Sequence, residues 1–245
     1  MECAGNGRVF LEPQRDGAQW EAGAVGNAEW TGVPLADLLT RAGVRESALE
    51  IMLEGADEGE IKEPPRPAGP IHYARSMPLA KANDDVLIAL RMNGEPLTPS
   101  HGFPARVIVP GWYGMAAVKW LKRIVATREP FQGYYQTIDY AYWERESGSP
   151  VLKPIREQRV KAQIARPEYA EQVRGGQPYR VHGAAWTTDA LIARVEVSTD
   201  GGGTWNDAHL LGEPQRNAWR LWEYDWDVPT SRGKAMLMAR ATDSQ

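Results

Sequence analysis

The sequence has few of the residues that form disulfides and metal clusters. It contains one cysteine, Cys3, in 245 residues, so no disulfide can form within the chain and no cysteine-cluster metal site is available. Histidine is also scarce, and no two histidines lie close enough in sequence to give the usual spacing of zinc ligands. The four are His72, His101, His182 and His209.

Excess positive charge and long apolar segments are missing as well. Lys and Arg number 28 against 32 for Asp and Glu, which gives a net charge of −4 and argues against a nucleic-acid partner. No apolar run is long enough for a membrane span. No phosphate-binding glycine motif of the Walker A or GxGxxG type occurs. Met1 is not followed by a signal-peptide pattern, and the sequence leaves the location, periplasmic or cytoplasmic, open.

The residues that are present indicate a folded protein rich in turns. Hydrophobic residues make up 42% and charged residues 24%, a globular composition. Glycine (24) and proline (18) are frequent, which indicates many turns and loops. The length suits one large domain or two ordinary ones.

The first part of the chain mixes helix and strand patterns. Residues 33–43 predict a helix, because their leucines share one face and Gly43 supplies a stop. Short apolar runs predict strands over residues 86–90, 105–109 and 118–125. We therefore expect an α+β domain over residues 1–143.

The pattern changes after a polar stretch at residues 144–153, which resembles a connection. Residues 193–198 alternate as a strand does, and residues 220–226 place Trp222, Tyr224 and Trp226 on one face. The glycines at 201–203 fit a hairpin tip. We expect a second domain, an all-β sandwich, over residues 144–245.

Several residues are candidates for chemistry, and each has an ordinary alternative. Cys3 lies in Cys-Ala-Gly-Asn-Gly-Arg, where its thiolate would be a soft metal ligand or a nucleophile, or else an inert buried thiol. Arg106, with His101 before it, would bind an anion, or both are plain loop residues. Asp57 lies in an acidic turn that is otherwise only solvated, and Tyr140 lies in a tyrosine-rich run typical of packing.

Taken together and in this order, these segments resemble the sulfite oxidase family of molybdopterin enzymes. The resemblance rests on residues 3–8, on residues 101–119 with their Gly-Trp-Tyr-Gly turn, and on Val-Lys-Trp-Leu at 118–121, and it extends over essentially the whole chain. It implies a molybdopterin-binding domain over residues 1–143 and an immunoglobulin-like dimerisation domain over residues 144–245. A homodimer with a molybdenum–molybdopterin cofactor follows from the resemblance.

The resemblance also implies a role for individual residues. Cys3 would be the molybdenum ligand, and Tyr140, Arg8 and Trp20 would surround the substrate. The pterin would be bound by Asp57, His101, Arg106, Ala117, Val118 and Lys119. A small oxyanion approaching an acidic protein needs local positive charge, which Arg8 would supply.

The implied reaction is oxidation of sulfite to sulfate by oxo transfer, with electrons passed to an external acceptor such as a cytochrome. One alternative is a related molybdenum enzyme that reduces nitrate or oxidises a sulfane. The other is a cofactor-free fragment that acts only as a dimerising β module. Both chain ends fall within motifs of the family, so we expect a sequence cut at both ends that binds the cofactor poorly and leaves an unpaired edge strand near Met236.

Overall fold

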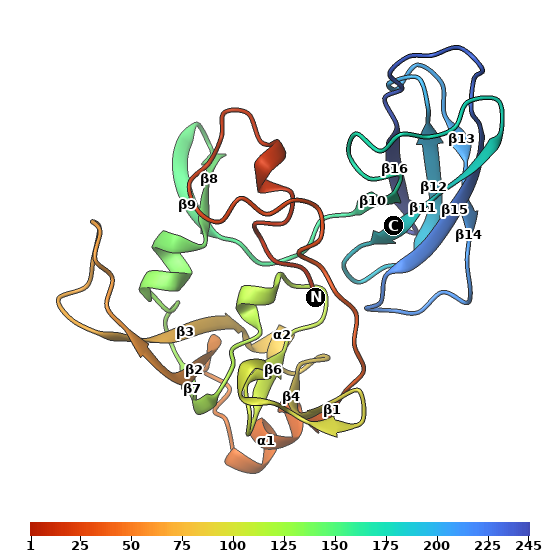
Figure 1. The fold of residues 1–245 in the computed structure, drawn as a ribbon. Coiled ribbons are helices and arrows are strands. Elements are labelled where there is room, and N and C mark those ends of the chain that lie inside the picture. Colours follow the sequence, from red (N-terminus) through yellow and green to blue (C-terminus); the bar gives the residue numbers. More distant parts are fainter. The chain divides into compact units, whose positions relative to one another are not determined.

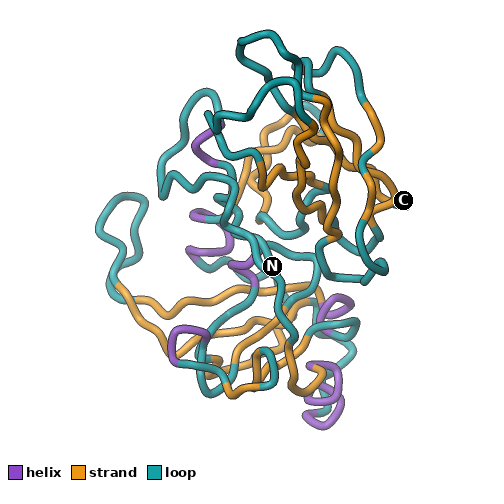
Figure 2. The backbone as a smooth tube through the Cα atoms, turned by 45° about the vertical axis from the view of Figure 1, so that its right-hand side comes forward, coloured by secondary structure: helices purple, strands orange, loops and turns teal.

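The computed structural model describes residues 1–245, which divide into two compact units, Met1–Glu157 and Gln158–Gln245. Strands and loops make up most of each unit, and helices are few and short (Figure 2). Neither α-helix has the length and apolar character needed to cross a lipid bilayer.

Unit 1 contains both α-helices and the first nine strands (Figure 1). The strands are β1 (Trp30–Pro34), β2 (Glu50–Gly59), β3 (Ile71–Pro78), β4 (Leu87–Met92), β5 (Glu95–Pro96), β6 (Arg106–Ile108), β7 (Leu121–Thr127), β8 (Ala141–Glu146) and β9 (Ser149–Pro154). The α-helices are α1 (Leu35–Ala42) and α2 (Leu79–Ala82). Three 3-10 turns, η1 (Arg8–Phe10), η2 (Pro99–His101) and η3 (Gly114–Ala116), and a π-helix, η4 (Tyr135–Asp139), complete the unit.

Two antiparallel sheets hold the core of unit 1. One has the order β1-β4-β5 with β6 also paired to β4, and the other has the order β3-β2-β7. Both sheets and α1 contribute to a single apolar cluster that includes Leu35, Ile51 and Val107, each 0% exposed. The predicted helix over 33–43 is confirmed as α1, which ends at Gly43 with φ 66°.

Two expectations for unit 1 need correction. The strand expected at residue 118 begins only at Leu121, because Trp120 has a φ of 48° and turns the backbone just before β7. The polar stretch expected as a connection forms the β8–β9 hairpin instead. Ser147 and Gly148, with φ of 47° and 88°, form its two-residue turn. The hairpin lies within the compact unit Met1–Glu157.

Unit 2 contains seven strands and no helix, in accordance with the all-β expectation. The strands are β10 (Lys161–Arg166), β11 (Pro178–Trp186), β12 (Ile192–Ser198), β13 (Asn206–Asp207), β14 (His209–Leu210), β15 (Arg220–Asp227) and β16 (Met238–Asp243). They form two antiparallel sheets, β10-β11-β15-β14 and β13-β12-β16.

One apolar cluster joins the two sheets of unit 2. It takes Val181 from β11, Val197 from β12, and Trp222 and Trp226 from β15. Trp222 is 0% exposed and Trp226 is 7% exposed, so the predicted inward face of β15 is confirmed. Residues 201–203 lie between the paired strands β12 and β13, which confirms the hairpin tip.

Glu196 on β12 predicts an acid sensitivity of unit 2. Its carboxylate accepts hydrogen bonds from Arg240 at 2.8 and 2.9 Å and lies 3.0 Å from Arg194. The hydrogen bonds from Arg240 lower the pKa of Glu196, desolvation opposes them, and the charge of Arg194 assists them. A depressed carboxylate pKa stabilises the fold above the ordinary pKa of glutamate, and this stabilisation disappears as pH falls through the folded-state pKa.

We therefore expect Glu196→Gln to lower the melting temperature at neutral pH, and this effect to disappear as pH falls below the ordinary pKa of glutamate and through the lower folded-state pKa of Glu196. Thermal melts of both proteins from neutral to acidic pH provide the measurement. Glu223→Gln is the matched control, since Glu223 lies 3.5 Å from Arg180 in the same unit. A difference between Glu196→Gln and the parent that stays constant with pH would contradict the prediction.

Candidate active site

Cys3 lies in a tight loop that is anchored on both sides. The Asn6 N–H donates to the Cys3 carbonyl at 2.9 Å, and the Cys3 N–H donates to the Ala24 carbonyl at 2.9 Å. The Asn6 side chain accepts from the Ala24 N–H at 2.9 Å. Cys3 is exposed, and its Sγ accepts the Gly5 N–H at 3.4 Å. The thiol is thus accessible to a ligand.

Charged groups gather around the phenol of Tyr140. Desolvation raises the pKa of Tyr140, the charges of Asp139 and Cys3 raise it further, and the charges of Arg75 and Arg8 lower it. Desolvation likewise raises the pKa of the Asp139 carboxyl, while Arg75 and Arg8 lower it. The guanidinium carbon of Arg75 lies 5.8 Å from the ring centroid of Tyr140, so this cation is a neighbour of the phenol.

Of the two other residues assigned to the substrate, the structure brings only one to Tyr140. Arg8 contributes to the field at Tyr140, and its Nη1 donates to the Ala18 carbonyl at 3.0 Å. A Cβ on Gly5 would lie 2.8 Å from Nη2 of Arg8, so the glycine leaves room for the guanidinium. The indole of Trp20 is 51% exposed and makes no hydrogen bond or ring contact, so its role stays a prediction.

The residues assigned to the cofactor lie on loops that are joined to one another. The Trp120 Nε1 donates to the Pro99 carbonyl at 2.8 Å, and the Lys119 Nζ donates to the Ser100 carbonyl at 3.1 Å. The Ala56 N–H donates to the Trp120 carbonyl at 2.8 Å, which brings in the turn that carries Asp57. Loops from three distant parts of the sequence therefore meet here.

Arg106 connects two of these loops from a buried position. Its Nη1 donates to the His101 carbonyl and its Nη2 to the Ala117 carbonyl, both at 3.2 Å. The guanidinium carbon lies 5.0 Å from the ring centroid of Trp30. Burial lowers the pKa of Arg106 to about 10, so the side chain remains a cation at neutral pH. Its Nε has no hydrogen-bond partner, and neither has Oδ1 of Asp57.

Three other assigned residues have different surroundings. Ala117 and Val118 are 6% and 1% exposed, and Val118 belongs to the apolar core, so a ligand would meet their backbone rather than their side chains. His101 is exposed, and its Nδ1 lies 2.8 Å from the Thr98 hydroxyl. Its ring is therefore accessible beside Arg106.

The Cys3 segment adjoins these loops. The Gly114 N–H donates to the Glu2 carbonyl at 2.7 Å, and Nη2 of Arg106 lies 3.8 Å from Sδ of Met1. An open cavity of about 560 Å³ lies against the same loops. Its lining includes Ala56, Asp57, Phe103, Trp120 and Lys122. The segment that carries Cys3 is thus joined to the loops around Arg106, and other residues of these loops line the cavity.

No group of three or more His, Cys, Asp or Glu side chains in the structure is arranged to hold a metal ion. A metal bound at Cys3 would need most of its ligands from a cofactor. A pterin with a dithiolene supplies such soft ligands, and a single protein thiolate completes them.

Family models divide the chain much as the structure does. Residues 1–135 match the oxidoreductase molybdopterin binding domain, and residues 152–245 match the Mo-co oxidoreductase dimerisation domain. The chain belongs to the sulfite oxidase family of molybdopterin oxidoreductases. Membership gives molybdenum–molybdopterin as the cofactor.

Relatives within the sulfite oxidase family differ in their named activities. Human mitochondrial sulfite oxidase is 36% identical over 99% of this chain and 46% of its own length. Nitrate reductase [NADH] 1 of Arabidopsis thaliana is 32% identical over 99% of this chain and 29% of its own length. The chain spans about half the length, or less, of the curated relatives it matches.

A solved structure of the family agrees with the fold. The sulfane dehydrogenase SoxCD from Paracoccus pantotrophus superposes with a TM-score of 0.83 at 33% identity, covering 99% of this chain and 59% of that chain. The alternative of a cofactor-free dimerising module lacks support from the family models, because residues 1–135 match the molybdopterin-binding domain.

The site residues fit the cofactor that the family implies. A phosphate-bearing pterin needs a buried cation and polar groups for its ring. The unpartnered Nε of Arg106 and Oδ1 of Asp57 provide a donor and an acceptor of this kind. The accessible Sγ of Cys3 provides the thiolate.

Gly102 is required for the packing of these loops. Its φ is 100°, and an added Cβ would lie 3.0 Å from the Lys119 Cβ and 3.1 Å from the Arg106 Cβ. We expect Gly102→Ala to lower the molybdenum and pterin content per chain, because it moves both cations. Gly94→Ala is the matched control, since Gly94 has a φ of 80° but open space around it, and it carries only a backbone cost of about 1–2 kcal/mol.

Metal analysis and pterin fluorescence on the purified variants measure the effect of Gly102→Ala. Cofactor loading equal to that of Gly94→Ala would show that the contact with Lys119 and Arg106 is not needed.

Proposed function

We propose that the protein oxidises sulfite to sulfate at a molybdenum centre ligated by Cys3. The observation that carries the proposal is the exposed thiol of Cys3, on a segment that is hydrogen-bonded to the turn at Gly114 and contacts the buried cation Arg106 through Met1. The charges of Cys3 and Arg8 also act on the phenol of Tyr140. Sequence identity of 36% to human sulfite oxidase over 99% of the chain supports the choice of substrate.

When bound, molybdenum–molybdopterin supplies an oxo group and accepts two electrons. In net terms, sulfite and water give sulfate, two protons and two electrons. The electrons leave to an external acceptor, for which we propose a cytochrome or a similar carrier.

The side chains of the chain would bind and orient the sulfite anion and assist the movement of protons at the substrate. Arg8 would attract the sulfite anion toward Cys3, because a local cation offsets the net charge of −4. Desolvation and the neighbouring negative charges keep the pKa of Tyr140 above its ordinary value. The phenol therefore stays protonated at neutral pH, and it would donate a hydrogen bond to a substrate oxygen and assist proton movement. Trp20 would line the substrate pocket.

We propose that Arg106, Lys119 and His101 bind the anionic part of the cofactor, and that Asp57 accepts hydrogen bonds from the pterin ring. Ala117 and Val118 would contribute backbone groups. Unit 2, with its two packed sheets, would be an immunoglobulin-like sandwich that joins two copies of the chain into a homodimer.

Sulfane oxidation is the second candidate, favoured by the TM-score of 0.83 to a sulfane dehydrogenase. Nitrate reduction is the third, through the relative from Arabidopsis thaliana. The discriminating experiment uses protein with measured molybdenum content. Sulfite and a persulfide are each offered with an artificial oxidant, and nitrate with an artificial reductant. Turnover of a persulfide or nitrate by molybdenum-loaded protein that leaves sulfite unchanged would overturn the proposal.

A further inference from the structure

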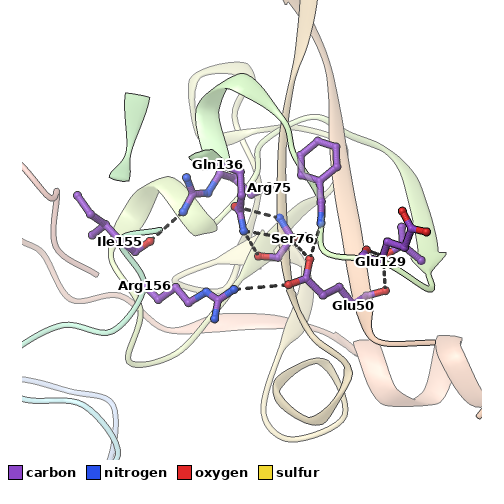
Figure 3. A network of polar contacts seen from close by, with 9 residues as sticks. Glu50, Arg75, Ser76, Glu129, Gln136, Ile155 and Arg156 are labelled. Carbon is purple, nitrogen blue, oxygen red and sulfur yellow. Dashed lines mark hydrogen bonds and ion pairs between the residues drawn. The ribbon is translucent and has the colours of Figure 1, made fainter. Parts of the chain in front are cut away.

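Arg75 is a buried cation for which the cofactor site has no assigned use. It lies on β3 and is 1% exposed, and it forms no ion pair. Its Nη1 donates to the Tyr135 carbonyl. Its Nη2 donates to the Ile155 carbonyl at 2.8 Å (Figure 3). No carboxylate is hydrogen-bonded to Arg75, although the charge of Asp139 acts on it, so the two backbone carbonyls bind its fork. Holding a buried guanidinium by carbonyls alone is costly, which points to a role for these two contacts.

The two carbonyls lie on the two segments that hold Tyr140. Tyr135 is the first residue of the π-helix η4, and Tyr140 directly follows that helix. The Ile155 N–H donates to the Tyr140 carbonyl at 2.9 Å. Arg75 thus fixes the chain before Tyr140 through one nitrogen and the backbone partner of Tyr140 through the other. Its guanidinium carbon lies 5.8 Å from the Tyr140 ring centroid.

A second network next to Arg75 holds the same π-helix. The Gln136 Nε2 donates to the Ser76 hydroxyl at 3.0 Å, and this hydroxyl donates to the Glu50 carboxylate at 2.6 Å. Arg156, which follows Ile155, lies 3.5 Å from Glu50 through its Nη2 (Figure 3). π-Helices are rare in proteins, and those that occur are often found at functional sites. Here the π-helix is hydrogen-bonded to Arg75 through Tyr135 and to Ser76 through Gln136.

We infer that Arg75 is a positioning residue for Tyr140. Its two Nη donors fix the π-helix and the segment at Ile155, which follows β9, so that the phenol faces the substrate. The inference rests on the proposed function of Tyr140. The inference depends on the forked shape of the guanidinium and not on its charge alone, because one rigid group binds two carbonyls on separate segments.

The first test measures the effect of the two Arg75 hydrogen bonds on the backbone and needs no enzymatic turnover. Hydrogen exchange of the purified full chain should show faster exchange over residues 134–141 and at residue 155 in Arg75→Met than in the parent. Arg123→Met is the matched control, since Arg123 lies on β7 and binds Glu54 at 2.7 Å. It should leave residues 134–141 unchanged. If Arg75→Met does not fold, Arg75→Lys replaces it, because lysine keeps the charge but lacks the fork. Unchanged exchange over residues 134–141 in the folded variant would overturn the inference.

The second test asks whether Arg75 acts through Tyr140. Arg75→Lys should lower kcat on the order of 10-fold with little change in KM, since small misplacements of a catalytic group have effects of this size or larger. In a Tyr140→Phe background the same substitution should have no further effect on kcat. Independent, multiplying effects would overturn the inference.

The two tests separate this inference from the proposed function. An impaired Tyr140→Phe with unchanged exchange in Arg75→Lys overturns the inference alone. Full activity of Tyr140→Phe overturns the proposed role of Tyr140, and the inference with it.

Discussion

Cys3→Ala is expected to lower turnover by more than about 100-fold, since even residues that only support metal ligands contribute 10–100-fold to affinity or activity. The pterin should remain bound, because its proposed contacts lie on the loops around Arg106 and Lys119, which do not depend on the thiol. Cys3→Ser should be impaired as well, since a hard oxygen ligand is a poor substitute for a soft thiolate.

The measurement for Cys3 combines molybdenum content, pterin content and turnover on the same preparation. Ala4→Ser is the matched control, because it places a hydroxyl one residue away and leaves the thiol and its Gly5 N–H donor in position. Cys3→Ala with the activity of the parent would exclude Cys3 as the metal ligand and with it the proposed centre.

Regular local patterns made much of the fold predictable from the sequence. The leucine face and the terminal glycine of residues 33–43 are local signals, and they predict α1 without any knowledge of distant contacts. Alternation likewise predicted the inward face of β15 at Trp222 and Trp226. In both segments the period of the apolar residues decides the structure.

Turn chemistry was harder to predict from composition. Glycine, serine and proline over residues 144–153 are as typical of a linker as of a hairpin. Pairing of β8 with β9 decides between them, and that pairing is a tertiary outcome. Trp120 is similar, because nothing in an apolar run signals a φ of 48° before β7.

The site was predictable only as far as its residues stand in recognisable motifs. Cys3 and Arg106 do so, whereas Arg75 and Asp139 were missed. The one sequence signal for Arg75 is a lone cation among the buried neighbours Ala74 and Met77 on β3. Such a residue more often marks an edge or a bulge, and its contacts to Tyr135 and Ile155 become visible only when the chain is folded.

Tyr140→Phe is expected to slow reduction of the metal by sulfite by about 10²-fold, the lower end of what a positioned acid–base group contributes. The substitution removes only the hydroxyl. The ring keeps its place 5.8 Å from the Arg75 guanidinium, and the backbone keeps its bond to Ile155. Stopped-flow reduction of molybdenum-loaded protein isolates this step from the later transfer of electrons to the acceptor.

Tyr142→Phe is the matched control for this prediction, because Tyr142 lies in the same tyrosine-rich run but is 42% exposed on β8. It should leave the reduction rate unchanged. The contrast between the two variants separates a hydroxyl that acts on substrate from one that only packs or faces solvent. Reduction rates of Tyr140→Phe and Tyr142→Phe that both equal the parent's would mean that Tyr140 has a packing role, as its tyrosine-rich surroundings alone suggest. A slow Tyr140→Phe with normal cofactor content places the lost step at the phenol, since metal, pterin and backbone contacts are then all retained.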